Sequence, residues 1–294
     1  MNAHAIEGLR KAVPYLRLFQ GQTFVIKLSG EALLNREDAT RILEQVGVLH
    51  QLGIRSVLVH GGGPQATSLA ERLGVESEFV GGRRVTNPEM LEAMVLALNG
   101  QAQATMLAAC RELGFDAVGL SGIDAGLVVA ERRKAGDVNF GEVGDITSVN
   151  PEVLEHLLDG GYLPIVSPLS ADASGNILNI NADTVAASLA ASLEAAKLIL
   201  VTGAPGVLRD KDDPLSVISH LDIQALQKLE KSGAIAGGML PKAASIAAAL
   251  EGGVGRVHVI SYQTPDSLLM EVFTNEGCGT LIVRDEAELM PGEI

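Results

Sequence analysis

The sequence predicts an α/β fold in which helices cover both faces of a mostly parallel sheet. The chain has 294 residues, about twice the length of a typical domain, so one large α/β domain or two lobes is expected. Short apolar runs alternate with helical stretches, and the glycines, 33 in all, cluster at the ends of apolar runs. This alternation is typical of strands joined by crossover helices, which build parallel sheets.

The elements of the first half follow from apolar runs and from the residues that end them. Thr23–Leu28 is expected as a buried strand, and Arg36–Leu52 as a helix that stops at Gly53. Ile54–Val59 is the next strand, directly before three glycines. In chain order there follow a helix at Pro64–Leu73, a long helix rich in Met, Leu and Ala at Pro88–Leu113, short strands at Asp116–Leu120 and Leu127–Ala130, a glycine-containing hairpin at Val138–Thr147, a helix at Pro151–Leu158 and a continuous apolar strand at Leu163–Ser167.

The second half continues the same alternation. In chain order it predicts an alanine-rich helix at Asn181–Glu194, a buried strand at Lys197–Val201, helices at Ile223–Ser232 and Pro241–Glu251, a strand at Arg256–Ile260, a helix at Pro265–Phe273 and a last strand at Thr280–Val283. The sequence has no repeat with a period of about 20–50 residues, and no low-complexity linker divides it. Two lobes would therefore share one continuous sheet.

The composition excludes several classes of function. Asp and Glu number 36 against 22 Lys and Arg, a formal charge of −14, which argues against a nucleic-acid surface. With 3 Tyr, 6 Phe and no Trp, base-stacking platforms are not expected. Cys110 and Cys278 are too few for a disulfide framework or a four-cysteine zinc site, and both are expected to be reduced and buried. No secretory signal and no apolar stretch of membrane-spanning length is visible, so a cytoplasmic protein is expected.

The standard fingerprints of nucleotide binding and catalysis are missing. The sequence has no P-loop motif, no G-x-G-x-x-G and no G-x-S-x-G elbow. The 6 histidines show no metal-ligand spacing, so no metal site built from protein ligands is expected. What the sequence has instead is four junctions where glycines lead into a helix, each able to present free backbone N–H groups to an anion.

Two of these junctions follow the first two strands. Lys27-Leu28-Ser29-Gly30 stands at the carboxyl end of a strand, where ligands bind in open α/β sheets. Its serine and glycine favour anion binding by Lys27 over a solvated strand-end charge. His60-Gly61-Gly62-Gly63-Pro64 has three glycines where one would make the turn, which indicates close approach of the backbone to an anion or a carboxylate. His60 itself is interpreted as a packed strand-end residue.

The other two junctions open helices in the second half. Asn179-Ile180-Asn181-Ala182-Asp183 is ordinary helix-capping chemistry, which is compatible with a ligand contact. Gly237–Lys242 places Lys242 beside the positive end of a helix dipole, a misfit that a bound anion would resolve. Two lysines and glycine loops without an evident base suit phosphoryl transfer to an anionic acceptor. A carboxylate, with an unperturbed pKa of ~4.3, needs no general base at neutral pH.

Four motifs together resemble the amino-acid kinase family and, within it, the N-acetylglutamate kinases of arginine biosynthesis. They are His60–Pro64, Gly82-Arg83-Arg84-Val85-Thr86, Asn179–Asp183 and Gly237–Lys242. The resemblance extends from about Gly8 to Val283 and implies a three-layer αβα sandwich around a mainly parallel, eight-stranded sheet. It also implies an oligomerisation helix at 1–20, an acyl-glutamate-binding and dimerisation lobe at 21–178 and an ATP-binding lobe at 179–294.

The resemblance further implies a reaction and the residues that carry it. ATP, with Mg²⁺ bridging its phosphates, would phosphorylate the side-chain carboxylate of N-acetyl-L-glutamate to an acyl phosphate. Lys27 and Lys242 would flank the transferred phosphoryl group, and Asp183 would hold both lysines. Arg84 would bind the α-carboxylate, with Arg83 left as a surface charge. The remaining implied contacts are Gly62, Gly63 and Asn179 for the substrate and Gly30, Gly203, Gly206, Gly238 and Met239 for the nucleotide.

Two departures from the motifs of the family leave alternatives open. The segment Lys27–Ala32 reads Lys-Leu-Ser-Gly-Glu-Ala, which is how uridylate kinases begin, whereas N-acetylglutamate kinases usually carry two glycines in this motif. The second departure is Gly203, which stands where relatives commonly have Asp. The alternative acceptors are another N-acyl amino acid or uridylate, although Gly82–Thr86 favours an acyl-glutamate. A non-catalytic arginine-sensing domain is a third alternative. Such a domain has no need to retain both lysines, Asp183 and the glycine loops together.

The first residues resemble the helix that interlaces dimers into hexamers in arginine-inhibited N-acetylglutamate kinases. Ala5–Gln20 places four apolar residues on one helical face, and Pro14 within it predicts a kink. The four are Ile6, Leu9, Val13 and Leu16. The resemblance implies a homo-oligomer, dimer or hexamer, and a site for L-arginine as inhibitor near this helix and Glu276-Gly277. Asp266, where arginine-inhibited members often have His, argues against inhibition.

Overall fold

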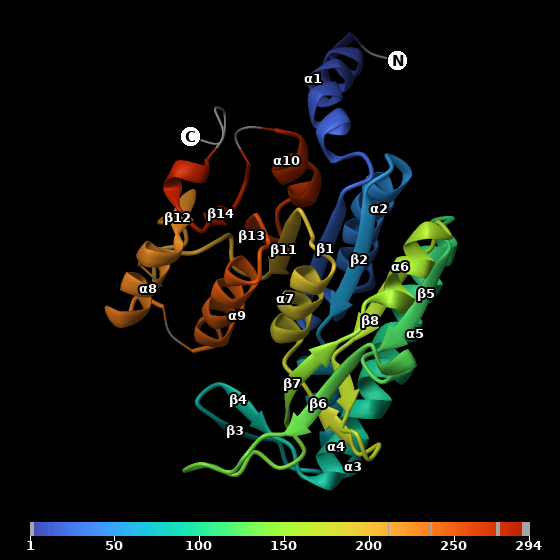
Figure 1. Ribbon diagram of the computed structural model, residues 1–294, viewed down its shortest axis with the longest axis vertical. Coiled ribbons are helices and arrows are strands. Elements are labelled where there is room, and N and C mark those ends of the chain that lie inside the picture. The colour runs from blue at the N-terminus through green and yellow to red at the C-terminus, as the bar shows by residue number, and fades with distance from the viewer. Residues whose placement is uncertain (1–2, 211, 236, 275–276, 290–294) are drawn as a thin grey trace.

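The central layer of the fold is an eight-stranded sheet. The computed structural model describes residues 3–210, 212–235, 237–274 and 277–289 (Figure 1). The strands lie in the order β12 (His220–Asp222), β14 (Thr280–Val283), β13 (Arg256–Ser261), β11 (Lys197–Thr202), β1 (Thr23–Leu28), β2 (Arg55–His60), β8 (Leu163–Ser167) and β5 (Ala117–Ser121). β14 runs antiparallel to β13, whereas the other neighbouring strands pair in parallel. The predicted mainly parallel sheet, shared by both halves of the chain, is confirmed.

Helices cover both faces of this sheet, which gives three layers. One face packs against α2 (Arg36–Gln51), α5 (Gln103–Glu112) and α10 (Ser267–Phe273), and the other against α6 (Glu152–Asp159), α7 (Ala182–Ser192), α8 (Ile223–Lys231) and α9 (Met239–Glu251). Because successive strand residues point to opposite faces, β1 contributes to both cores. Phe24 and Ile26 pack under α2, whereas Val25 packs under α7. Continuous apolar strands are therefore buried on both sides, as the sequence predicts.

A second, four-stranded sheet and a short hairpin lie at the end of the molecule opposite α1 (Figure 1). The second sheet has the order β10 (Ile177–Asn179), β9 (Leu169–Ala171), β6 (Val128–Arg132) and β7 (Gly144–Val149), and the short hairpin pairs β3 (Glu78–Val80) with β4 (Arg83–Val85). The prediction of a hairpin within 138–147 is wrong. The hairpin forms between β6 and β7, and residues 133–143 are its connection. Of the two glycines that suggested a turn, Gly141 lies in this connection with a positive φ and Gly144 begins β7.

The long helix predicted at Pro88–Leu113 is present but changes its winding along its length. It consists of α4 (Pro88–Val95), a π-helical segment (Leu96–Ala102) and α5, and it follows α3 (Gly63–Leu73) in the chain. The π-helical segment brings Leu98 against Gly62: a Cβ at Gly62 would lie 2.4 Å from Leu98 Cδ2. A side chain at the second glycine of the three-glycine loop would therefore force the Leu98 side chain to move.

The N-terminal helix α1 (Ala3–Phe19) projects from the body of the molecule and runs on through Pro14 (Figure 1). Its Val13 and Leu16 are half-buried, while the side chains of Ile6 and Leu9 lie outside the described residues. Cys110 is buried as expected and Cys278 is only partly buried, and both are free thiols. Among the described residues, no helix combines the length and apolar character needed to cross a bilayer.

Candidate active site

Most of the predicted site residues line a cavity of about 460 Å³ at the carboxyl edge of the large sheet. Carboxyl ends of parallel strands meet at one edge, so β1 and β2 deliver their junctions to the same place. The walls come from these two strand ends, the β3–β4 hairpin, β10 and the first turns of α7 and α9. Seven predicted residues line the cavity: Lys27, Gly30, Gly62, Gly63, Arg84, Asn179 and Asp183.

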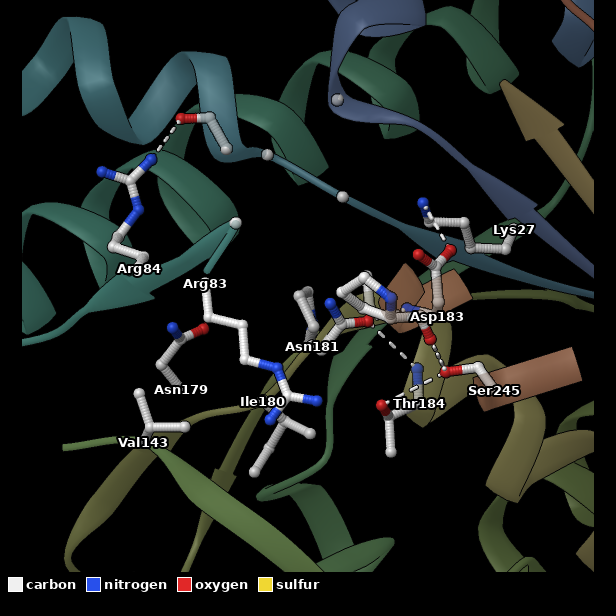
Figure 2. Close-up of a pocket in the computed structure, with 18 of the residues that line it drawn as sticks. Lys27, Arg83, Arg84, Val143, Asn179, Ile180, Asn181, Asp183, Thr184 and Ser245 are labelled. Carbon is white, nitrogen blue, oxygen red and sulfur yellow. Dashed lines mark hydrogen bonds and ion pairs between the residues drawn. The ribbon is translucent and has the colours of Figure 1, made fainter. Parts of the chain in front are cut away.

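Lys27 and Asp183, which both line the cavity, form an ion pair (Figure 2), and Lys242, outside the lining, completes the cluster. Lys27 Nζ lies 2.7 Å from Asp183 Oδ1, and Lys242 Nζ lies 3.1 Å from both carboxylate oxygens. Lys27 comes from the face of β1 that packs under α7. Asp183 is in the first turn of α7, which the side chain of Asn181 caps by accepting from the backbone N–H of Asp183 at 2.8 Å. Lys242 reaches Asp183 because α9 packs against α7.

The electrostatics of this cluster favour a bound anion. Burial would raise the pKa of Asp183, but the ammonium groups of Lys27 and Lys242 outweigh it and lower that pKa to about 2. Burial, with the nearby charge of Lys27, lowers the pKa of Lys242 to about 8, although Asp183 acts in the opposite direction. At neutral pH the cluster therefore holds two cations and one anion. The cluster reaches the cavity through Lys27 and Asp183, and an anionic oxygen bound there would neutralise its net positive charge.

The two glycine junctions touch each other above this cluster. A Cβ at Gly30 would lie 2.9 Å from both the backbone nitrogen of Gly62 and Cδ of Pro64. A Cβ at Gly61 would lie 3.0 Å from the backbone nitrogen of Gly30. The contacts at position 30 are too short for backbone atoms to tolerate, so glycine is required there, whereas a side chain at position 61 would need the Gly30 backbone to shift by a few tenths of an ångström. Gly63 has no such neighbour, and its glycine is not explained by packing.

The guanidinium of Arg84 is held by the protein itself. Nη1 donates to Ser77 Oγ at 3.0 Å, and Nη2 donates to Thr67 Oγ1 at 2.8 Å and to the carbonyl of Gly63 at 3.1 Å. The group also stacks over the ring of Phe79, 4.5 Å from its centroid. Burial lowers the pKa of Arg84 below its usual value. Arg84 is thus a fixed cation in the cavity wall next to the three-glycine loop.

Arg83 differs from the sequence-based expectation of a plain surface charge. It is exposed, but it lines the cavity, and Figure 2 shows its side chain extending on the Ile180 side of the hairpin while Arg84 turns the other way. In the described part of the chain Arg83 has no hydrogen-bond or ion-pair partner. The signal for this was available: neighbouring residues on a strand point to opposite sides, so Arg83 and Arg84 cannot occupy one environment.

The asparagines of the third junction have separate places. Asn179 lies on β10, and its Nδ2 donates to Thr86 Oγ1 at 3.2 Å, which ties it to the end of the β3–β4 hairpin segment. Asn181 is the cap of α7. Sequence reasoning missed several other lining residues because they come from elements it did not predict or from helix positions without a motif. They include Phe79, Arg133, Val143, Thr184, Ser188 and Ser245.

The remaining predicted nucleotide residues lie outside the cavity lining. Gly203 and Gly206 are in the loop after β11, and Gly238 and Met239 begin α9. A Cβ at Gly206 would lie 2.6 Å from Thr280 Oγ1, so packing alone explains this glycine. Met239 packs on the apolar core under α7 and α9. Within the described residues, no group of three or more His, Cys, Asp or Glu is arranged to hold a metal ion.

Comparison with known proteins gives one consistent result. The sequence profile of the Amino acid kinase family matches residues 22–261. An acetylglutamate kinase of Myxococcus xanthus is 43% identical over 98% of this chain and 97% of its own length. An acetylglutamate kinase of Moorella thermoacetica is 41% identical over 94% of this chain and 96% of its own length.

Solved structures agree with the sequence comparison. N-acetylglutamate synthase of Neisseria gonorrhoeae, in complex with coenzyme A and N-acetyl-glutamate, superposes with a TM-score of 0.85 at 30% identity. The match covers 95% of this chain but 63% of the synthase. A carbamate kinase of Giardia lamblia superposes with a TM-score of 0.67 at 19% identity over 90% of this chain, a likeness of fold alone.

Proposed function

The chain belongs to the amino acid kinase family, and we propose that it transfers the γ-phosphoryl group of ATP to the side-chain carboxylate of N-acetyl-L-glutamate. The product is an acyl phosphate of arginine biosynthesis. Relatives named acetylglutamate kinase, 40–43% identical over 94% or more of this chain, support this acceptor. The observation that carries the chemistry is the Lys27–Asp183–Lys242 cluster, two members of which, Lys27 and Asp183, line the cavity.

The reaction needs positioned positive charge and no general base. A carboxylate oxygen of the acceptor attacks the γ-phosphorus, the bond from that phosphorus to the β–γ bridging oxygen breaks, and ADP leaves with the electron pair. The acceptor is already ionised, so no proton moves. We assign Lys27 and Lys242 to the oxygens of the transferred group, which gain negative charge in the transition state. Asp183 keeps both ammonium groups in place and takes no part in bond making.

Acceptor recognition is assigned to the wall built by Arg84, Gly62, Gly63 and Asn179. Arg84 would bind the α-carboxylate of the acceptor, and its contacts with Thr67 and the Gly63 carbonyl fix the plane of its guanidinium before substrate arrives. Four of its five N–H groups already point to protein partners, if Met90 Sδ at 3.8 Å is included. A bidentate contact with substrate would therefore replace at least one of them.

The nucleotide is assigned to the carboxyl-terminal lobe, 179–294, and the acceptor to the lobe formed by 21–178. Gly30, Gly203, Gly206, Gly238 and Met239 are proposed to contact ATP, and the helix dipole of α9 points its positive end toward Lys242 and the phosphates. Mg²⁺ would be held by the ATP phosphates. This fits the described residues, because the carboxylate that lines the cavity, Asp183, is already bonded to two lysines.

Assembly and feedback are proposed from α1. Its exposed and half-buried apolar residues, such as Leu18 and Leu16, suit an interface between copies of the chain, in a dimer or a hexamer. The helix ends beside α10 and over a buried network in which Lys197 Nζ lies 2.9 Å from His258 Nε2 and His258 Nδ1 lies 2.7 Å from Glu271 Oε1. We place an inhibitory L-arginine here, near Gly277; Glu276 lies outside the described residues.

Two measurements test these assignments. A coupled ATP assay over N-acetyl-L-glutamate, other N-acyl amino acids and uridylate identifies the acceptor, and a faster rate with any other acceptor would overturn the first choice. An arginine-sensing domain without catalysis would give no ADP with any of them. Light scattering on the full chain and on a chain that starts at Gln20 tests assembly. The shorter chain is expected to form an assembly with fewer subunits. Arginine titration of the rate then tests feedback separately.

A further inference from the structure

We propose that His60 is a positioning residue for phosphoryl transfer, because its imidazole holds the Gly61 carbonyl and thereby turns the Gly62 N–H toward the transferred group. The inference rests on the proposed kinase reaction and adds a residue that sequence reasoning leaves as simple packing. It concerns the peptide between the first two glycines of the three-glycine loop.

The hydrogen bond that holds this peptide is fully buried. His60 is the last residue of β2 and has 0% exposure. Its Nδ1 lies 3.0 Å from the carbonyl oxygen of Gly61. A carbonyl oxygen only accepts, so Nδ1 carries the proton and donates. This fixes the tautomer of the ring and the direction of the Gly61 carbonyl at the same time.

The direction of the carbonyl determines the direction of the next N–H. The described chain has no cis peptide bond, and in a trans peptide the C=O and the following N–H point in opposite directions. The Gly62 N–H therefore points away from the imidazole. His60 lies on the same face of β2 as Leu58, which packs under α2 and α5, whereas Lys27 lies on the face covered by α7. The N–H is thus turned toward the side that holds the lysines.

This N–H is kept available for a ligand. Gly62 lines the cavity, and its backbone nitrogen donates no backbone hydrogen bond within the described part of the chain. A side chain at position 30 would cover the Gly62 N–H, because a Cβ there would lie 2.9 Å from the Gly62 nitrogen. A free N–H in the same cavity lining as the Lys27 ammonium is a donor arrangement that can stabilise an oxyanion.

The surroundings keep the imidazole neutral. Burial lowers the pKa of His60, and the Gly61 carbonyl and the nearby Gln103 side chain only partly oppose this. Gln103 faces the ring from α5, and its Nε2 donates to the Leu120 carbonyl at 3.2 Å. His60 Nε2 has no hydrogen-bond partner among the described residues, so a second ring proton would be unsatisfied in the core.

A purely structural role does not account for a histidine here. The ring is fully buried, and its Nε2 has no hydrogen-bond partner in the described part of the chain, which costs free energy that a leucine of similar size would not cost. What leucine lacks is the donor at Nδ1. The function of the residue therefore lies in that donor.

The test compares two substitutions in the full-length enzyme. His60→Asn keeps an N–H near the position of Nδ1, whereas His60→Leu removes it and fills the space. We expect kcat to fall about 10- to 100-fold in His60→Leu, with both KM values within about threefold, and to stay within about threefold of the wild type in His60→Asn. Leu58→Ala, on the same strand and face and also fully buried, is the control: its Tm should fall while kcat is retained.

A second readout separates positioning from general damage. Affinity for MgADP with aluminium fluoride and acceptor reports the transition-state arrangement, and affinity for the ATP analogue AMPPNP reports ground-state binding. His60→Leu should lose about tenfold or more in the first and little in the second. A wild-type kcat in His60→Leu, or equal losses in both affinities and in both variants, would overturn the inference alone. A wild-type enzyme inactive toward N-acetyl-L-glutamate would overturn the proposed function and this inference with it.

Discussion

Removing the charge of Asp183 tests the balance of the catalytic cluster. Asp183→Asn is nearly isosteric, but it leaves the ammonium groups of Lys27 and Lys242 together without a carboxylate, in a site where Lys27 and Asp183 are buried and the Lys242 side chain is 12% exposed. The pKa of Asp183 is about 2 against an unperturbed 3.8, a difference that corresponds to about 2 kcal/mol of folding free energy at neutral pH. Removing one partner of a buried ion pair costs about 3–5 kcal/mol, which is the upper limit for the loss of folding free energy expected in Asp183→Asn.

The sign of the pH dependence distinguishes this loss from an ordinary packing defect. A carboxylate with a lowered pKa stabilises the fold above its unfolded pKa, and the stabilisation is lost as pH falls from about 4 toward 2. At pH 7 the full loss in Asp183→Asn should therefore be measured by urea unfolding. Near pH 9.5 the loss of folding free energy should be smaller. Lys242, with a pKa of about 8, is then neutral, so the carboxylate of Asp183 balances the charge of one lysine instead of two.

A matched control is available on the surface. Arg55 Nη1 and Asp159 Oδ1 are also 2.7 Å apart, but the Asp159 side chain is 68% exposed. Asp159→Asn should cost under about 1 kcal/mol and leave kcat unchanged. We expect Asp183→Asn to lower kcat at least tenfold as well, since the lysines lose their anchor. A loss of stability below about 1 kcal/mol at pH 7, or the same loss at both pH values, would refute the assigned charge balance.

The remaining predictions concern the same cavity. Lys27→Ala and Lys242→Ala should each lower kcat by about 10²–10³ with smaller changes in KM, as for a removed transition-state donor, and a wild-type kcat in either would contradict its role. Arg84→Lys should raise the acceptor KM substantially while the ATP KM hardly moves, and an ATP-specific defect would place Arg84 in the wrong lobe. For the free enzyme, kcat/KM should fall as pH rises through about 8, because Lys242 loses its proton; bound phosphates favour the charged form, so the fall in kcat should occur at higher pH.

Strand-end reasoning predicted the part of the site that is local in sequence. Lys27 and the three glycines follow directly from where two buried strands stop, and Asp183 follows from a helix start. Asp183 and Lys242 are 59 residues apart along the chain, and their contact depends on how α7 packs against α9. It could not be derived from strand ends and helix starts. The cluster was predicted through resemblance alone, and the structure supplies its physical cause.

The sequence was least informative where strands are short and edges are exposed. The β3–β4 hairpin has three residues in each strand, too few for a visible alternation, and its tip glycines Gly81 and Gly82 both have positive φ. The hairpin expected within 138–147 was misplaced because β7 pairs with a strand that begins at Val128, across a long connection. Both errors fall beside the cavity, where backbone irregularity serves the ligand more than the core.

The alternation of side chains at strand ends explains how one sheet edge serves two purposes. Lys27 on β1 points to the α7 side, where it meets Asp183, while His60 on β2 points to the α5 side, where it is buried. Because each stands at the end of its strand, one presents its own charge to the cavity and the other acts through the backbone that follows it. A one-residue shift of either strand would exchange these faces and bury an unpaired ammonium. The register of β1 against β2, with Lys27 opposite Val59 and Leu28 opposite His60, is therefore a condition for the site as well as for the core.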